Sequence, residues 1–332
     1  MEEQYLTEAE AIDIIREMLG APGSAVEVGV GDDAAVYHFA SSGVILTVDS
    51  IYEGIHFTLD NYSLADVGWK AMAASISDIA AMGGQPECAL ISVAMDAPPT
   101  EGQIRELMGG ALEMARSYDC QIVGGDLCRS ASGLGLSVTV AGTRHPCGPV
   151  LRSEARDGDI IGVTGTLGDS AAGLYVLQSG SEEMRAKFAG LIQKHLRPGP
   201  AVEAGDALAS SGVSAMDDVS DGLAPDVVHI CQASDVGCEI TGEDVPLSGE
   251  LRVLAEEACA DPLGWALGGG EDYQLLFTAP PGGFEAALRA LKAHGIPAVR
   301  IGVIKPAEHG MKLVARDGQS IDLEGLGYDH FL

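Results

Sequence analysis

Apolar residues alternate or run continuously in some segments of the chain and recur at helical spacing in others. The stretch Val44–Asp49 is β-branched and mostly apolar, which predicts a buried strand whose last residue is a carboxylate. Ser63 and Asp66 match a capping box, so we expect a long helix that begins there, runs through Asp78 and ends at Gly83–Gly84. These two elements place acidic side chains inside or at the end of apolar segments.

Segments with strand-like and helix-like patterns continue to alternate along the rest of the chain. Strands are expected at 89–95, 121–123, 134–140, 159–164, 273–278, 298–304 and 311–315, with helices at 104–115, after 168–170, after Pro198, after 220–221 and at 284–293. The strand at 134–140 alternates, which favours a half-buried, antiparallel strand. Because strands and helices alternate in both halves, we predict an α/β protein with mixed sheets.

A dense turn signal at His145–Pro149 separates the two halves, and the pattern of strands and helices starts afresh after it. We therefore expect an N-terminal domain at 1–148 and a C-terminal domain at 149–332. With 332 residues, of which 46% are hydrophobic and 20% charged, the chain can bury a large core.

Composition narrows the possible partners. Nineteen basic against 49 acidic residues give a formal charge of −30, which repels phosphate backbones and anionic membranes, so we expect no nucleic-acid partner. No apolar run reaches the roughly 18 residues that span a bilayer, and the chain begins with acidic residues, so we expect a cytoplasmic protein without a membrane partner. The seven cysteines form no Cys-x-x-Cys pair, so we expect them to be reduced and mostly buried.

Acidic residues at the ends of predicted elements are the most informative chemical feature. They are Asp32, Asp33, Asp49, Asp78, Asp126, Asp217, Asp218 and Asp221. Each could cap a helix or close a turn for local reasons. Asp49 and Asp78 lie in apolar segments, however, where an unpaired charge would cost several kcal/mol. Carboxylates in such positions suit Mg²⁺, which takes oxygen ligands from side chains and nucleotide phosphates.

Other candidate groups are weaker signals. Glycine-rich turns at 124–125, 165–168 and 268–270 could offer backbone amides to phosphates. The scarce cations Lys70 and Arg152 could neutralise a phosphate or pair with carboxylates. The chain has no Gly-x-x-x-x-Gly-Lys-Ser/Thr loop, no Asp-Phe-Gly and no Gly-x-Gly-x-x-Gly ahead of a helix, which argues against P-loop, protein-kinase and Rossmann proteins.

Over nearly its whole length, the chain resembles the thiamine-monophosphate kinase family in the order and spacing of its motifs. The motifs are Gly31–Ala35, Thr47–Asp49, Gly54–Phe57, Ser77–Gly83, Gly124–Asp126, Thr164–Gly173, Asp218–Leu223, Gly269–Tyr273 and Gly327–Phe331. Related families in the superfamily of aminoimidazole ribonucleotide synthetase share some of them. The motifs around His56, Glu271 and Tyr328 favour the kinase.

The resemblance implies an N-terminal domain that forms a barrel-like core with a second copy, and a C-terminal domain that closes over the nucleotide. It implies several magnesium ions on Asp32, Thr47, Val48, Asp49, Asp78, Asp126, Asp218 and Asp221, with Val48 offering only its carbonyl. It implies ATP contacts from Gly125, Asp126, Arg152 and Ser220, and thiamine-monophosphate contacts from His56, Glu271 and Tyr328. Asp49, Asp78 and Asp126 would be the catalytic residues.

The implied reaction is direct in-line transfer of the γ-phosphoryl group of ATP to thiamine monophosphate. Selenophosphate synthetase and the hydrogenase-maturation dehydratase fit poorly, since the first resembles a protein with an N-terminal reactive cysteine and the second ends in cysteine, whereas here the first cysteine is Cys88 and the last residue is Leu332. A non-catalytic acidic protein that binds divalent cations remains an alternative. It would bind magnesium without nucleotide.

Overall fold

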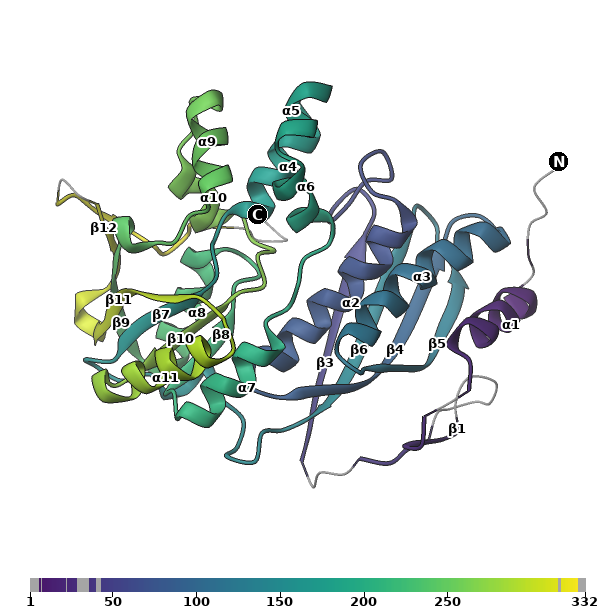
Figure 1. Ribbon diagram of the computed structural model, residues 1–332, viewed down its shortest axis with the longest axis horizontal. Helices are drawn as coiled ribbons and strands as arrows, with labels where there is room; N and C mark the ends of the chain where they lie inside the picture. Colours follow the sequence, from purple (N-terminus) through teal and green to yellow (C-terminus); the bar gives the residue numbers. More distant parts are fainter. Residues whose placement is uncertain are drawn as a thin grey trace. The chain divides into compact units, whose positions relative to one another are not determined.

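The structure is a computed structural model that describes residues 6, 8–21, 23–28, 36–39, 43–315 and 318–327. The chain divides into two compact units, residues 1–79 with 85–144, and residues 80–84 with 145–332. Each unit has its own sheet and its own helices (Figure 1). The predicted α/β class with mixed sheets is confirmed. In the described part of the chain, no helix is long and apolar enough to cross a membrane.

The first unit is a four-stranded mixed sheet with helices on one face. Its elements are α1 (Glu8–Leu19), β1 (Val26–Val28), β2 (Val36–Tyr37), β3 (Val44–Tyr52), α2 (Leu64–Ala81), β4 (Gln85–Met95), α3 (Glu101–Ser117), β5 (Gln121–Arg129) and β6 (Gly135–Thr143). The strand order is β3-β6-β4-β5, with β6 antiparallel to both neighbours and β4 parallel to β5. The strands β1 and β2 pair separately.

The two faces of this sheet differ in their surroundings. Helix α2 begins with the predicted capping box, in which Asp66 N donates to Ser63 Oγ at 3.2 Å. Farther along the helix, Ser75 Oγ donates to the Val138 carbonyl of β6 at 2.9 Å, which fixes α2 against the sheet. On the opposite face Leu46 is 70% and Val48 61% exposed. Among the described strands this sheet is open, with β3 and β5 as its edges, and it does not close into a barrel within the chain.

The second unit contains a seven-stranded sheet of order β13-β12-β9-β11-β7-β10-β8. Its strands are β7 (Ile160–Thr164), β8 (Ala215–Asp218), β9 (Val236–Thr241), β10 (Leu275–Ala279), β11 (Ala298–Pro306), β12 (Met311–Val314) and β13 (Ser320–Asp322). Its helices are α4 (Asp169–Ser179), α5 (Glu182–Lys187), α6 (Ala189–Leu196), α7 (Val202–Ser211), α8 (Leu223–Ser234), α9 (Gly249–Ala258), α10 (Pro262–Gly268) and α11 (Pro281–Ala293), with short 3₁₀ turns at Arg152–Glu154, Gly242–Asp244 and Ala307–His309.

Both faces of the seven-stranded sheet are buried. One core packs α8 against residues such as Ile161 and Ala215, and the other packs α7 and α11 against residues such as Met216 and Phe277. Ala215 and Met216 are consecutive on β8, so their side chains point to opposite faces of the sheet, one into each core. The side chain of Asp217 therefore lies on the same face of β8 as Ala215, toward α8. The side chain of Asp218 lies on the same face as Met216, which is the opposite one.

One predicted turn is wrong. Gly124 and Gly125 lie inside β5 rather than at a phosphate-binding turn. A Cβ at Gly125 would lie 1.9 Å from the Ile91 carbonyl oxygen of β4, so the missing side chain allows the two strands to approach and pair.

Candidate active site

Two predicted magnesium ligands of the first unit touch each other. Residues at odd positions of β3 face the helices, since Ile45 and Ile51 are buried on that side. Thr47 is on this face, and its Oγ1 donates a short hydrogen bond to Asp78 Oδ2 of α2. Asp49 is the next residue on the same face. The structure thus places Thr47, Asp49 and Asp78 on the helix-covered side of the sheet, each half-buried.

Asp126 lies at the other edge of the same sheet. Asp49 of β3 pairs with Val138 of β6, Val138 pairs with Ile91 of β4, and Ile91 pairs with Gly125 of β5. Asp126 is the residue after Gly125. Three strand spacings of about 4.8 Å separate the two edges by about 14 Å. Two ligands of one Mg²⁺ lie within about 4 Å of each other. A single copy of the chain therefore does not bring Asp126 and Asp49 to one ion.

His56 is held in a turn that follows β3. Its Nδ1 accepts a hydrogen bond from Tyr52 N at 3.1 Å, so in the neutral ring Nε2 carries the proton and is a donor. Lys70 lies beneath this turn and is fully buried; its Nζ donates to the His56 carbonyl at 3.1 Å and to Tyr62 Oη at 2.9 Å. Lys70 thus supports the turn.

In the second unit, two loops bring four predicted residues together. Asp218 ends β8, Ser220 and Asp221 follow in the next loop, and the loop before β10 carries Glu271. Glu271 N donates to the Ser220 carbonyl at 2.7 Å, and Tyr273 N donates to the carbonyl of the residue before Ser220 at 2.9 Å. These backbone bonds hold the two loops side by side.

The backbone around Glu271 is in an uncommon conformation. Glu271 and Tyr273 have φ values of 59° and 48°, in the left-handed region that non-glycine residues seldom adopt. The preceding Gly270 has a φ of 65°, and a Cβ there would lie 2.4 Å from the Ser220 carbonyl oxygen. Glu271 Oε2 lies 3.4 Å from Nδ1 of the buried His195, so its carboxylate is oriented by a neighbouring helix.

Arg152 joins this site through Asp217. Arg152 Nη2 lies 2.8 Å from Oδ1 of Asp217, whose side chain is 1% exposed. Burial lowers the pKa of Arg152, but the attraction of Asp217 and the hydrogen bond to it outweigh burial and raise the pKa above its ordinary value. The guanidinium therefore stays charged and is held in one place.

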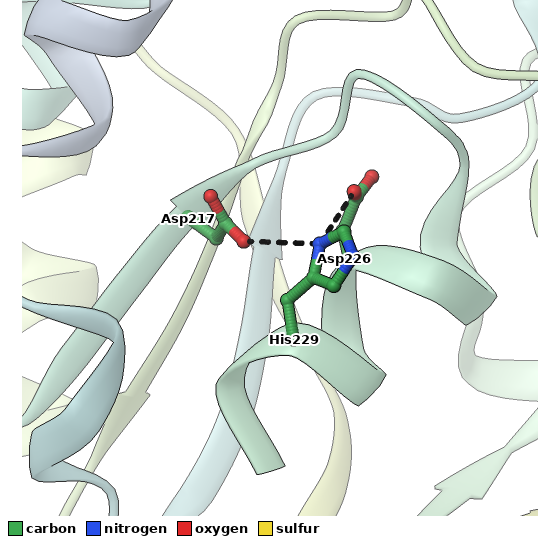
Figure 2. A group of neighbouring side chains, drawn as sticks. All are labelled: Asp217, Asp226 and His229. Carbon is green, nitrogen blue, oxygen red and sulfur yellow. Dashed lines mark ion pairs between the residues drawn. The ribbon is translucent and has the colours of Figure 1, made fainter. Parts of the chain in front are cut away.

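Two further residues of this region were not singled out in the sequence. Asp226 and His229 lie on α8, beside Asp217 of β8 (Figure 2). Burial, followed by the nearby charges of Asp217 and Asp218, raises the pKa of Asp226 well above its usual range. Burial, followed by repulsion from Arg152, lowers the pKa of His229. The i, i+3 spacing of an aspartate and a histidine on one helix face is the signal that could have indicated them.

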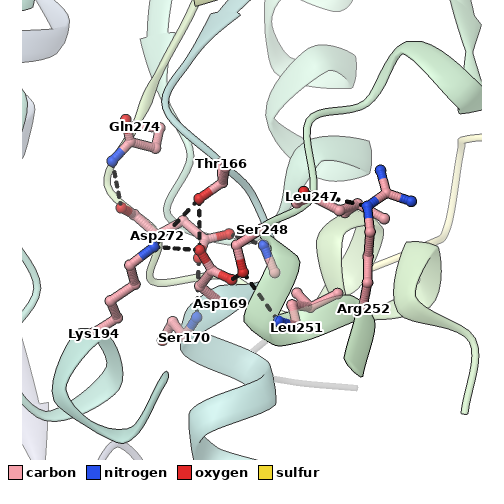
Figure 3. Close-up of polar contacts among 11 residues, drawn as sticks. Thr166, Asp169, Ser170, Lys194, Leu247, Ser248, Leu251, Arg252, Asp272 and Gln274 are labelled. Atoms are coloured by element: carbon pink, nitrogen blue, oxygen red, sulfur yellow. Dashed lines mark hydrogen bonds and ion pairs between the residues drawn. The ribbon is translucent and has the colours of Figure 1, made fainter. Parts of the chain in front are cut away.

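The glycine-rich turn at 165–168 has a structural role (Figure 3). Three of its four amides are used within the protein, because Gly165 N donates to Pro297, Leu167 N to Pro246 and Gly168 N to Asp272. The expectation that these amides bind phosphate is therefore wrong. Asp272 also accepts from Ser170 N at 3.1 Å and caps the first turn of α4.

The environment of Asp272 favours a protonated carboxyl. Burial raises its pKa to about 7, although the two backbone hydrogen bonds and the charge of Lys194 oppose the shift. Lys194 pairs with the neighbouring carboxylate of Asp169, which is 2% exposed and also accepts from Thr166 Oγ1 at 2.6 Å. A cavity of about 340 Å³ opens beside this network.

Two predicted residues, Asp32 and Tyr328, lie outside the described residues. Val48 is on β3 with its side chain exposed on the open face, so only its backbone could reach the side where Thr47 lies.

Comparison with known proteins gives a consistent result. Residues 31–143 match the family model "AIR synthase related protein, N-terminal domain", and residues 156–313 match the corresponding C-terminal domain. The thiamine-monophosphate kinase of Bacillus subtilis (strain 168) is 38% identical, with 93% of this chain and 94% of that protein aligned. That of Escherichia coli (strain K12) is 39% identical, with 92% of each chain aligned.

Solved structures agree with the sequence comparison. Thiamine-monophosphate kinase from Stenotrophomonas maltophilia K279a has a TM-score of 0.82 at 31% identity and covers 96% of this chain and 99% of its own. AaThiL complexed with AMPPCP and TMP has a TM-score of 0.77 at 34% identity over 100% of both chains. The hydrogenase maturation protein HypE of E. coli, at 20% identity and a TM-score of 0.77, covers 98% of this chain and shares the fold. The chain belongs to the thiamine-monophosphate kinase family, within the AIR synthase related proteins.

Proposed function

We propose that this chain transfers the γ-phosphoryl group of ATP to thiamine monophosphate, giving thiamine diphosphate and ADP by direct in-line displacement. The observation that carries the proposal is the match over 100% of both chains to a relative complexed with an ATP analogue and TMP. The two groups of side chains described above have the chemistry that such a transfer requires. The acceptor phosphate is already ionised near neutral pH, so the reaction needs no general base.

Several magnesium ions fit the residues of the first unit. Asp49, Asp78 and Thr47 offer hard oxygen ligands on one side of the sheet, where half-burial makes an uncompensated negative charge unfavourable. We assign Val48 to this set through its carbonyl, and Asp32 and Asp126 to the same metal centre. Magnesium, when bound, would screen the repulsion between two anionic reactants.

In the second unit we assign Asp218 and Asp221 to further ions, and Ser220 and Arg152 to ATP together with Gly125 and Asp126 of the first. Arg152 suits an anionic phosphate because Asp217 holds its guanidinium in place while half of the side chain remains exposed. Because Arg152 is already held in place, little further conformational entropy of this side chain is lost when a ligand binds.

For the acceptor we assign His56, Glu271 and Tyr328. The Nε2–H of His56 can donate to the phosphate of thiamine monophosphate, since Nδ1 already accepts from the backbone. The Glu271 carboxylate is complementary to the cationic thiazolium ring. His56 is thereby a binding group rather than a base.

We further propose that the protein is a homodimer whose two four-stranded sheets form the expected barrel-like core. The sheet exposes large apolar side chains on the face that lacks helices, among them Leu46, Val48 and Leu90. Its edges β3 and β5 carry Asp49 and Asp126 in adjoining rows of the same sheet. If β3 of one copy lies against β5 of a second, the backbone at Asp49 of one copy approaches the backbone at Asp126 of the other. Because side chains alternate along a strand, the two carboxylates start from opposite faces of the sheet, and the twist of the joined edges would have to bring them to one ion.

A mixing experiment tests this arrangement. Asp49→Asn and Asp126→Asn, each inactive alone, are unfolded together and refolded in equal amounts. Random pairing makes half of the dimers mixed, and each mixed dimer keeps one intact site of two, so about a quarter of wild-type activity should return. No recovery from a fully dimeric mixture would mean that the two aspartates act within one copy.

The reaction itself is tested by incubating the protein with ATP, magnesium and thiamine monophosphate, beside a control without acceptor. Equal amounts of thiamine diphosphate and ADP are expected. ADP without thiamine diphosphate would rule out this acceptor, and the absence of both products would favour the cation-binding alternative.

A further inference from the structure

Asp217, Asp226 and His229 form a group of three potential metal ligands that the proposed kinase reaction does not use (Figure 2). His229 Nδ1 lies 3.6 Å from Asp226 Oδ1 and 3.9 Å from Asp217 Oδ2. One atom from each residue lies within 4.8 Å of the others, and among the described residues this is the group that meets that condition.

These distances are close to those of a bound metal ion. An ion with ligands at about 2.1 Å in tetrahedral geometry separates its ligand atoms by about 3.4 Å. The observed separations exceed this value by a few tenths of an ångström for the two pairs that include the imidazole. A bound ion would require the imidazole nitrogen to lie a few tenths of an ångström closer to each carboxylate.

The three ligands come from one helix and one strand of the second unit. Asp226 and His229 are at i and i+3 of α8, so they share one face of that helix, and Asp217 comes from the end of β8. Each carboxylate is oriented by its second oxygen, since Asp217 Oδ1 pairs with Arg152 and Asp226 Oδ2 accepts from Asp221 N at 3.2 Å. Such outer contacts orient the ligands of metal sites in general.

The imidazole provides an independent indication of a ligand. The Nδ1 atom of His229 is buried and has no hydrogen-bond partner in the described part of the chain, although it points between two carboxylates that are each 1% exposed. A ring nitrogen that faces two carboxylates either carries a proton itself or binds a cation that it shares with them. The His229 side chain is 42% exposed, which leaves a path for an ion from solvent.

The balance of charge also favours a cation. The guanidinium of Arg152 interacts electrostatically with the three buried carboxylates Asp217, Asp218 and Asp226. A bound cation would stabilise the ionised carboxylates of Asp217 and Asp226 in this region of low dielectric constant. Asp218 points to the opposite face of β8, so an ion bound by Asp217 is separate from one bound by Asp218.

We propose that Asp217, Asp226 and His229 bind a first-row divalent cation of borderline softness, of the class of Zn²⁺ and Co²⁺. A nitrogen ligand beside two carboxylates favours these metals over Mg²⁺, which prefers oxygen alone. The inference goes beyond the proposed kinase function and does not depend on it.

The test uses the full-length protein and Co²⁺, with excess Mg²⁺ present to occupy sites made of oxygen alone. The exposed Cys128, Cys147 and Cys259 are alkylated first, because thiolates also bind Co²⁺. The wild type should show visible cobalt absorption that saturates at one ion per chain, with affinity at least about 10-fold higher than in His229→Gln or Asp226→Asn.

His309→Gln is the matched control. His309 also has a buried ring nitrogen that faces a carboxylate, with Nε2 at 3.4 Å from Glu239, but it faces one carboxylate instead of two. This variant should bind cobalt as the wild type does. Thermal melts of the three variants verify folding, and anomalous diffraction at the cobalt edge should give its peak between Asp217, Asp226 and His229.

Equal cobalt binding by the wild type and His229→Gln overturns the proposal, as does an anomalous peak at another site. A loss in His309→Gln as large as in His229→Gln does the same. Because the measurement needs neither ATP nor thiamine monophosphate, its outcome is independent of whether the chain has the proposed activity.

Discussion

The two units arrange their candidate residues in opposite ways. In the second unit, backbone hydrogen bonds between two loops gather Asp218, Ser220, Asp221 and Glu271 within one chain. In the first unit, Asp49 and Asp126 lie at opposite edges of an open sheet, about 14 Å apart by strand spacing. The contrast teaches that hydrogen bonds within one copy bring the second group together, whereas in one copy the first group stays divided between two edges of a sheet.

The largest expected effect tests the first unit. Asp49→Asn should lower kcat by at least about 1000-fold, because it removes an anionic metal ligand from the proposed site of charge development. Circular dichroism and the melting temperature should remain close to those of the wild type. Asp60→Asn, at an exposed position nearby, is the control and should keep full activity. Retained turnover in Asp49→Asn would remove this aspartate from the metal centre.

A stability measurement separates the structural from the ligand-binding role of Gly125. Gly125→Ala should lower the free energy of unfolding by about 3 kcal/mol, because the new Cβ collides with the Ile91 carbonyl and forces β4 and β5 apart. Gly109→Ala in α3, where a Cβ meets nothing within 4 Å, should stabilise the protein by about 0.5 to 1 kcal/mol. Urea unfolding measures both. Unchanged stability with a raised KM for ATP would instead show that Gly125 serves the nucleotide alone.

The pH dependence of stability tests the second unit. The folded pKa of Asp272 is raised to about 7, so between pH 4 and 7 the unfolded chain loses this proton while the folded chain keeps it. Stability due to this group therefore falls as pH rises, by about 2 to 3 kcal/mol between pH 5 and 8. In Asp272→Asn this part of the pH dependence should disappear in urea unfolding.

Asp261→Asn controls for the loss of a capping carboxylate, since Asp261 caps α10 from an exposed position. Identical pH profiles of the wild type and Asp272→Asn would show that this carboxyl titrates near its ordinary pKa.

The smallest effect concerns the acidic surface of both units. Glu106→Lys on α3 and Glu285→Lys on α11 reverse exposed charges away from the candidate residues. Each should change the free energy of unfolding by less than about 0.5 kcal/mol and leave kcat within about twofold of the wild type. A larger loss of activity in either variant would mean that the surface charge contributes to the reaction.

Long elements with a clear period were predictable from the sequence. The apolar run of β3 and the capping box of α2 placed Thr47, Asp49 and Asp78 on neighbouring elements, and the structure brings Thr47 and Asp78 into contact. The short strand β8 was not predicted, because its sequence Ala-Met-Asp-Asp has neither an apolar run nor an alternation. The strand β9 and the helices α5, α6, α9 and α10 were also missed.

The contacts that organise the second unit depend on tertiary structure. Arg152 and Asp217 are far apart in the sequence, and nothing local indicates that the 3₁₀ turn and β8 meet. The group of Asp217, Asp226 and His229 likewise depends on the packing of α8 beside β8. Gly124–Gly125 was misread as a turn, because the sequence does not reveal that the Ile91 backbone lies where a side chain would be.

The left-handed backbone at Glu271 and Tyr273 has a consequence for how fast a ligand could bind. Each such residue costs about 1 kcal/mol or more, and the hydrogen bonds to the loop after β8 keep both in this conformation in the folded protein. A segment already fixed in this way does not have to be ordered during an encounter. Association at Glu271 should therefore proceed in one kinetic phase whose rate grows linearly with ligand concentration.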